Sequence, residues 1–242
     1  RTLQHQRFQE PGFSLELARQ CIDTKLNNMI SMIHYITRNQ KGTAQICQTI
    51  EQARKRLSKS TTAQEILGME GWAASHYFQI YGSNLPQEFQ FKTRSRPAED
   101  PANALLNFGY MTLLHEIETN LDANNFDPYL GILHTTQNYR TSLALDILEE
   151  FRQPFIDLFT MKILNLKQIR PEHFQKQEDS VLLTEEGFRA YFKLYEDHMG
   201  DQDGDEPGLR QMIDKQVLSL KKHILGEQNY TPFALQDFSE KK

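Results

Sequence analysis

Apolar side chains recur every three or four positions along most of this chain, which is the spacing that places them on one face of an α-helix. The longest run predicts an amphipathic helix with apolar positions Leu15, Ala18, Ile22, Leu26, Met29, Ile33 and Ile36. Further helices are expected at about 46–57, 62–82, 100–114, 141–151 and 209–225, and another begins near 184. Because strand-like runs are short and confined to the region near Val181, the predicted fold class is mainly α.

Several predicted helices carry signals at their ends. Thr62 and Glu65 have the spacing of a capping box, in which side chains satisfy the first free backbone N–H groups of a helix. Asp100 is suited to cap the next helix, with Pro101 at its first position. Pro154 has no N–H group and should kink or break the helix that starts near 141.

Size and charge bound the class of protein. The 242 residues and 38% hydrophobic content can bury a sizeable core, as one large domain or a domain with a small appendage. The net charge of -5 argues against a strongly basic nucleic-acid binder, although a local basic stripe is compatible with it. Cys21 and Cys47 form no disulfide framework or zinc motif, which favours a reducing, cytoplasmic location. No apolar run is long enough to span a membrane.

Glu70 is the first candidate for chemistry. It lies inside a predicted helix, in the segment GMEGWAASHYF, close to the apolar face. Gly68 and Gly71 flank it, and each glycine costs a helix roughly 1 kcal/mol relative to alanine. This cost suggests that something approaches the backbone closely here. A buried carboxylate needs a partner, so two interpretations stay open: a structural ion pair beside helix-packing glycines, or a functional site.

A second acidic cluster lies in the segment TSLALDILEEFRQP. Asp146 is three residues before Glu149 and four before Glu150, so these carboxylates share a helical face and repel one another. Leucine and isoleucine neighbours indicate that part of the cluster is buried. Arg140 and Arg152 could neutralise the charge, and a bound metal ion is the alternative.

His134 ends an apolar stretch just before this cluster, and by itself it reads as a structural residue. An imidazole together with two or more carboxylates suits Mn²⁺ or Mg²⁺ better than structural zinc. The acidic loop after residue 200 is no calcium loop, because Glu206 takes the place of its central glycine and Met212 that of its last glutamate. Walker loops, nucleophile elbows and paired Glu-x-x-His motifs are also absent from the sequence.

At these residues the chain resembles the CRISPR-associated spacer-acquisition integrases, the family of CRISPR-associated protein one. The similar segments are SLELARQCIDTKLNNM, GMEGWAASHYF, RSRPAEDPANALLNFGYMTLL, GILHTTQNYRTSLALDILEEFRQP, LTEEGFRAYFKLYE and NYTPF. Each segment alone is a weak signal. Their joint order and spacing over nearly the whole chain make the resemblance specific.

The resemblance implies a metal site. Its ligands would be Glu70 of the GxEG block, His134 of the GxLH block and Glu149 of the acidic block, holding Mg²⁺ or Mn²⁺. Asp146, one turn earlier, is implied as a further catalytic residue or an alternative ligand. The resemblance also implies DNA contacts for Arg94, Arg96, Arg140 and Tyr110. For the three arginines the alternative is salt bridging to the acidic cluster.

The resemblance further implies a metal-dependent DNA integrase and endonuclease, in which the 3′-OH of a short foreign DNA attacks a phosphodiester in a CRISPR array. Its expected partners are double-stranded DNA (prespacer and CRISPR repeat), a second copy of the chain in a homodimer, and CRISPR-associated protein two as a bridging subunit. One alternative is a metal-dependent nuclease of branched or single-stranded DNA. Another is a DNA-binding or structural module without chemistry.

The domain organisation expected from this family has three parts. Residues 1–13 would be a linker from an N-terminal β-domain that is missing from this chain, residues 14–170 the metal-binding helical catalytic domain, and residues 171–242 its C-terminal helical extension. The missing β-domain leaves room for a fused domain upstream of residue 1.

Overall fold

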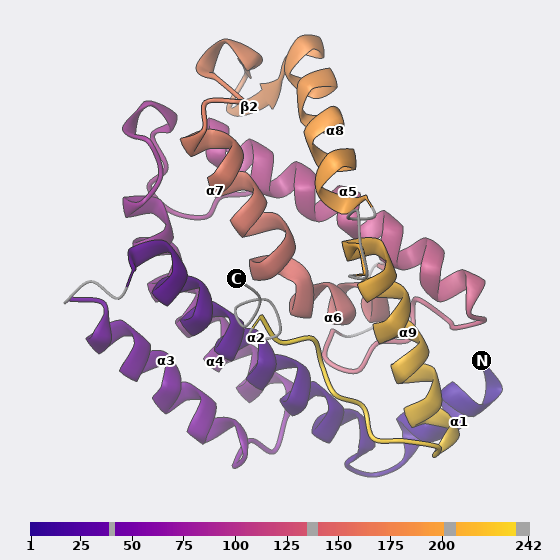
Figure 1. The fold of residues 1–242 in the computed structure, drawn as a ribbon. Helices are drawn as coiled ribbons and strands as arrows, with labels where there is room; N and C mark the ends of the chain where they lie inside the picture. The colour runs from indigo at the N-terminus through magenta and orange to yellow at the C-terminus, as the bar shows by residue number, and fades with distance from the viewer. Residues whose placement is uncertain (39–41, 135–139, 201–206, 236–242) are drawn as a thin grey trace.

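The computed structural model describes residues 1–38, 42–134, 140–200 and 207–235, and these are mainly helical, as predicted (Figure 1). The helices are α1 (Thr2–Gln9), α2 (Phe13–Thr37), α3 (Ala44–Leu57), α4 (Ala63–Ser83), α5 (Pro101–Ala123), α6 (Ser142–Phe151), α7 (Leu158–Asn165), α8 (Glu185–Met199) and α9 (Leu209–Leu225). A hairpin of two antiparallel strands, β1 (Phe174–Gln177) and β2 (Ser180–Leu183), precedes α8. None of the described helices is long and apolar enough to cross a membrane.

Helices α2, α3 and α4 pack against one another as the N-terminal layer of the fold (Figure 1). The apolar face predicted for α2 is buried, and its core positions include Ile22, Leu26 and Met29. Helix α4 begins where the capping signal predicted, because the Thr62 hydroxyl accepts a 3.2 Å hydrogen bond from the Glu65 backbone N–H. Helix α2 also packs on α6, so it joins this layer to the rest of the molecule.

The central helices begin and bend at the positions that the sequence signals indicate. Asp100 caps α5 through a 2.8 Å bond from the backbone N–H of Asn103, with Pro101 at the first helical position. At Pro154, where a kink or break is expected, a π-helical segment, Arg152–Asp157, connects α6 to α7. A wider turn accommodates a proline, because the residue cannot donate the regular hydrogen bond and its ring would press on the preceding turn.

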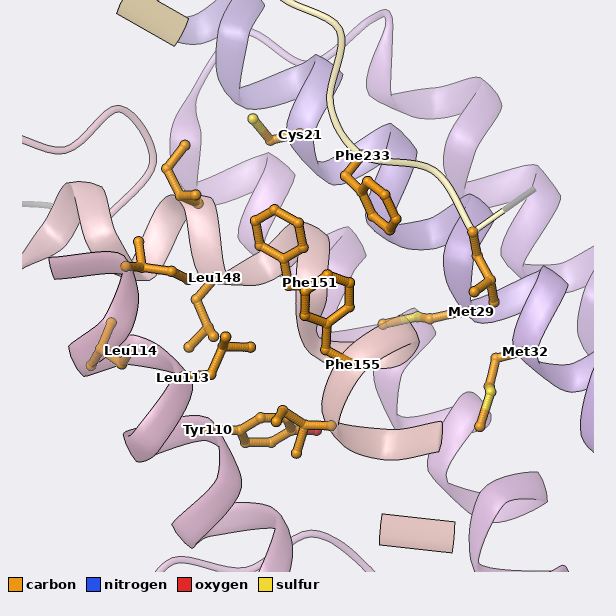
Figure 2. Packing of buried hydrophobic residues seen from close by; sticks show 14 of the residues in the cluster. Cys21, Met29, Met32, Tyr110, Leu113, Leu114, Leu148, Phe151, Phe155 and Phe233 are labelled. Carbon is orange, nitrogen blue, oxygen red and sulfur yellow. The ribbon is translucent and has the colours of Figure 1, made fainter. Parts of the chain in front are cut away.

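The segment that follows α9 completes the hydrophobic core. Phe233, in the segment after α9, packs on Phe151 and Phe155, with ring centroids 5.4 and 5.6 Å apart (Figure 2). The Leu113 and Tyr110 side chains of α5 face the same cluster from the other side in this view. The segment after α9 is therefore part of the same hydrophobic core as α2, α5 and α6.

The segment predicted to be a linker, residues 1–13, contains helix α1. This helix packs on α2 and α9, and its Gln4 is buried and donates a 3.0 Å hydrogen bond to the Asp127 carbonyl oxygen. At the other end of the chain, α9 spans the predicted 209–225. The acidic loop discussed above falls at residues 201–206, outside the described residues.

Candidate active site

Lys25 stands between two of the three residues expected to bind metal. Its ammonium group, on α2, donates hydrogen bonds to the carboxylates of Glu70 on α4 and Glu149 on α6. Only 5% of the Lys25 side chain and 7% of the Glu149 side chain are exposed, against 18% for Glu70. Three helices that are distant in sequence thus bring two carboxylates to one cationic group.

A second cation neutralises Glu149. The Arg152 guanidinium, one turn later in the chain, lies 3.0 Å from the other carboxylate oxygen of Glu149. Burial disfavours the charged carboxylate, but the fields of Arg152 and Lys25 and the Lys25 hydrogen bond outweigh it and lower the pKa of Glu149 to about 2. Arg152 is therefore one of the neutralisers that the sequence suggested, and Glu149 is ionised at neutral pH.

His134 is held by Asp146, the acid one turn before Glu149. Its Nδ1 lies 2.6 Å from Oδ1 of Asp146, and the backbone N–H groups of Ile132, Leu133 and His134 donate to the same carboxylate. Gly131 allows this closure, because a Cβ atom there would lie 2.8 Å from Oδ2 of Asp146. Asp146 therefore contacts the histidine and its loop, which is the position of a residue that orients His134.

The charge of His134 depends on these neighbours. Burial lowers its pKa, but the Asp146 hydrogen bond and the charges of Asp146 and Glu149 raise it by more, so the net shift is upward. The contribution of Glu149 to this shift means that His134 lies within electrostatic reach of that carboxylate. Residues 135–139, which follow it, lie outside the described residues.

Tyr110, expected to contact DNA, is buried in this structure. Its side chain is 1% exposed and its hydroxyl donates to the buried carboxylate of Asp157, so these contacts give no support to a DNA-binding role. The Arg152 guanidinium lies over the Tyr110 ring, with its Cζ atom 4.5 Å from the ring centroid. Burial raises the pKa of Asp157 to about 6, although the hydroxyls of Tyr110 and Tyr77 lower it by donating hydrogen bonds. Tyr110 thus holds the Arg152 guanidinium in place through a cation–π contact.

The three arginines expected to contact DNA have different surroundings. Arg94 is half-buried and donates to the side-chain amide oxygens of Asn103 and Asn107 on α5, so it ties the preceding loop to that helix. Arg96 and Arg140 are exposed. Among the described residues, none of the three pairs with the acidic cluster, whose arginine partner is Arg152.

Glu150, the neighbour of Glu149, binds the end of the chain. It accepts hydrogen bonds from the Tyr230 hydroxyl at 2.5 Å and from the Phe233 backbone N–H at 2.8 Å. Burial raises its pKa to about 7, opposed by the Tyr230, Phe233 and Cys21 hydrogen bonds. The carboxylate of Glu150 contacts Cys21, Tyr230 and Phe233, so it holds the C-terminal segment.

Sequence reasoning missed Lys25. The signal was present, because Lys25 follows Cys21 by four residues and precedes Met29 by four, and both are core positions of α2. A lysine on a buried apolar face needs an anionic partner. The sequence does not show which carboxylates supply it.

The donor set is compatible with a divalent cation. The fact that one ammonium group binds both Glu70 and Glu149 shows that this pair accepts a cation, and carboxylate with imidazole ligands suits Mg²⁺ or Mn²⁺. Within the described residues, however, no three His, Cys, Asp or Glu side chains are grouped as a ready metal site. Lys25 occupies the position between the carboxylates.

The fold and the site together define a helical domain in which a buried and a partly buried carboxylate share one cationic group, near a histidine that an aspartate orients. A sequence profile of the family described as CRISPR associated protein Cas1 matches residues 1–197. The chain therefore belongs to the Cas1 family.

Individual relatives agree with this membership. The CRISPR-associated endonuclease Cas1 3 of Thermus thermophilus is 31% identical over 243 residues, which cover 98% of this chain and 71% of that protein. The solved structure of a CAS1 protein from Thermotoga maritima superimposes with a TM-score of 0.82 at 26% identity, covering 94% of this chain and 70% of the other. A casposase bound to integration product has the same fold, with a TM-score of 0.85 at 21% identity over 100% of this chain and 69% of the other.

Proposed function

We propose that this chain is the catalytic domain of a metal-dependent DNA integrase and endonuclease that inserts short foreign DNA into a CRISPR array. In this reaction a DNA 3′-OH attacks a phosphodiester at the repeat border. A new phosphorus–oxygen bond forms to the incoming strand, and the 3′ oxygen of the cut strand leaves. The observation that carries the proposal is the pair of carboxylates, the buried Glu149 and the partly buried Glu70, that share one ammonium group, with His134 within electrostatic reach of Glu149.

Each residue has a role that follows from its contacts. Glu70, Glu149 and His134 would hold Mg²⁺ or Mn²⁺, which supplies charge stabilisation on the attacked phosphate and the leaving oxygen. Asp146 keeps the His134 ring in one orientation. The Arg152 guanidinium adds fixed positive charge next to Glu149, where a phosphate would otherwise be repelled.

The proposed partners are double-stranded DNA, as prespacer and repeat, a second copy of this chain, and CRISPR-associated protein two. The exposed Arg96 and Arg140 would contact DNA phosphates. Support for the protein partner comes from a solved Cas6-RT-Cas1–Cas2 complex, to which the chain is similar with a TM-score of 0.86 at 24% identity over 98% of this chain and 26% of the other. The reaction would take place in the cytoplasm, where the array lies.

A strand-joining assay tests the proposal. A labelled prespacer duplex and a plasmid carrying a repeat are incubated with the protein and Mn²⁺. Glu149→Ala and His134→Ala should lower joining at least about a hundredfold, as expected when a group needed in the transition state is removed. Glu172→Ala, whose side chain is 63% exposed, is the matched control and should join normally. Normal joining by either site variant would overturn the assignment.

A nuclease that uses water in place of the 3′-OH is the second candidate, because the curated relatives are named endonucleases. Product analysis separates the two, since integration yields joined strands and hydrolysis yields only cut ends. A module without chemistry would give neither product, and Mn²⁺ would not raise its melting temperature.

A further inference from the structure

A groove runs between α3 and α4 on the side of α4 away from Lys25. Its volume is about 490 Å³, and its lining includes Arg56, Lys59, Gly68, Met69 and Trp72. Trp72 is 45% exposed, an unusual position for a large aromatic ring. The groove therefore offers a flat aromatic surface at the protein exterior.

The charge of the groove is positive where it meets α3. Arg56 and Lys59 are both exposed, and in the part of the chain that the structure describes neither forms an ion pair. The acidic residue of the groove, Glu65, uses its carboxylate to accept a 2.6 Å bond from the Thr61 backbone N–H at the start of α4. The two basic side chains are thus left for an anionic ligand.

Two glycines expose the α4 backbone beside the ring. A Cβ atom at Gly68 or Gly71 would meet nothing within 4 Å, so no neighbouring part of the described protein requires a glycine at either position. Both glycines weaken the helix. The described protein therefore gives no packing reason for the two glycines, whereas a ligand that approaches the α4 backbone closely would give one.

The helical period connects this groove to the candidate active site. At about 100° per residue, Gly71 lies between Glu70 and Trp72 around the α4 axis, and Gly68 lies one turn before Trp72 on nearly the same line. A strand seated on Trp72 can cross α4 over these bare backbone positions and reach Glu70. Side chains at the two glycine positions would stand in that path.

We propose that the groove between α3 and α4 binds an unpaired segment of the DNA substrate, which then crosses α4 at Gly68 and Gly71 toward Glu70. A base stacks on Trp72, and the phosphates lie next to Arg56 and Lys59. Stacking on an aromatic ring beside basic side chains is the general way in which proteins hold single strands without reading their sequence. The assignment rests on the proposed function, because it takes the DNA substrate from it.

The single tryptophan of the chain makes the test direct. An oligothymidylate strand or a blunt duplex of equal length is titrated into the protein in EDTA, so that no chemistry occurs. The single strand should quench Trp72 fluorescence to saturation, and the duplex should not. Equal quenching by the duplex, or none by the single strand, would overturn the proposal.

Binding of a labelled oligothymidylate, followed by anisotropy, tests the individual groups. Trp72→Ala should weaken binding about tenfold, with Trp72→Phe in between. The double variant Arg56→Ala/Lys59→Ala should also reduce the salt dependence, by about 1.4 in the slope of log K against log salt for two phosphates. The matched control, Lys193→Ala/Lys215→Ala on α8 and α9, removes two exposed charges and should bind like the wild type. Wild-type affinity of Trp72→Ala would contradict the stacking.

The proposed crossing of the strand over Gly68 and Gly71 predicts opposite changes in protein stability and in strand binding. Gly68→Ala/Gly71→Ala should raise the melting temperature, because both substitutions favour the helix and meet open space. The same variant should bind the oligothymidylate several-fold more weakly. A variant that melts higher and binds like the wild type would overturn the crossing.

Failure of the two proposals is distinguishable. Glu149→Ala should keep the fluorescence quenching in EDTA while losing strand joining. If Glu149→Ala joins normally, the catalytic assignment is wrong while the groove is judged on the quenching alone.

Discussion

Asp146 fixes the orientation of His134 through a 2.6 Å contact between its Oδ1 and the imidazole Nδ1. A carboxylate that only accepts hydrogen bonds requires the proton on Nδ1, so Nε2 is the ring nitrogen that would bind the proposed metal ion. Asp146 is in turn fixed by three backbone N–H groups of residues 132–134. Residues 132–134 therefore fix the position of Asp146, and Asp146 in turn fixes the orientation of the His134 ring.

Asp146→Asn should weaken Mn²⁺ binding about 10–100-fold, because a neutral amide replaces the charged acceptor and its NH2 group meets an N–H group that the carboxylate accepts from. The free Mn²⁺ signal in electron paramagnetic resonance measures this affinity directly. Strand joining should fall by a similar factor while the far-ultraviolet circular dichroism stays unchanged. Asp197→Asn, an exposed acid on α8, serves as the control. Unchanged Mn²⁺ affinity in Asp146→Asn would show that the pair is only structural.

Lys25→Met tests whether the ammonium group competes with a metal ion. Removing one partner of a buried ion pair leaves the other charge unpaired, so the metal-free variant should lose about 3–5 kcal/mol of unfolding free energy. Mn²⁺ should recover part of this loss, because it binds the same oxygens of Glu70 and Glu149. The melting temperature with and without Mn²⁺ measures the effect. A Mn²⁺-induced shift no larger than that of the wild type would contradict the competition.

Local signals in the sequence predicted much of the fold. Helix α9 ends at its predicted boundaries because Gly208 and Gly226 flank a regular apolar pattern, and α5 begins at a proline behind an aspartate cap. The π-helical segment at Pro154 was not predicted, because sequence shows that a proline disturbs a helix and not how the neighbours absorb the disturbance. That outcome depends on distant residues, including Tyr77, which donates to Asp157 in the same segment.

For the candidate site, the sequence supplied the three expected ligands through the family resemblance and not through local patterns. The pairing of Glu70 with Glu149 follows from the packing of α2 against α4 and α6, and no local pattern contains it. The resemblance to the family supplied the three candidate ligands as a set. Lys25, Tyr110 in its buried position and the Glu150 contacts all depend on which helices meet, so they required the structure.

Glu150 is predicted to hold the C-terminal segment against the site. Tyr230→Phe removes the 2.5 Å hydrogen bond to its carboxylate while keeping the ring in the core. The segment 227–235 should then exchange its amide hydrogens faster. At pH 8, above the Glu150 pKa of about 7, the protein should lose about 1.5–3 kcal/mol of unfolding free energy, the range for a hydrogen bond to a charged group. Hydrogen exchange with mass spectrometry checks this, with Tyr129→Phe, 49% exposed, as the control. Unchanged protection of the segment would contradict the prediction.

His198 should make the protein sensitive to acid. Burial lowers its pKa to about 4, assisted by the charge of Lys162 and opposed by its 2.9 Å hydrogen bond to the Phe155 carbonyl oxygen. A histidine whose folded-state pKa is depressed stabilises the fold above its ordinary value of 6.5, and this contribution is lost as the pH falls toward 4. The loss is about 3 kcal/mol at most, from the difference between the two pKa values.

The measurement is the free energy of unfolding in urea at several pH values between 7 and 4. His198→Gln should show a shallower decline than the wild type, because glutamine can donate to the Phe155 carbonyl oxygen and takes up no proton in this range. His115→Gln, whose side chain is 69% exposed, should keep the wild-type slope and so controls for the loss of one histidine. An equal decline in His198→Gln and the wild type would show that carboxylates, and not this buried imidazole, set the response to acid.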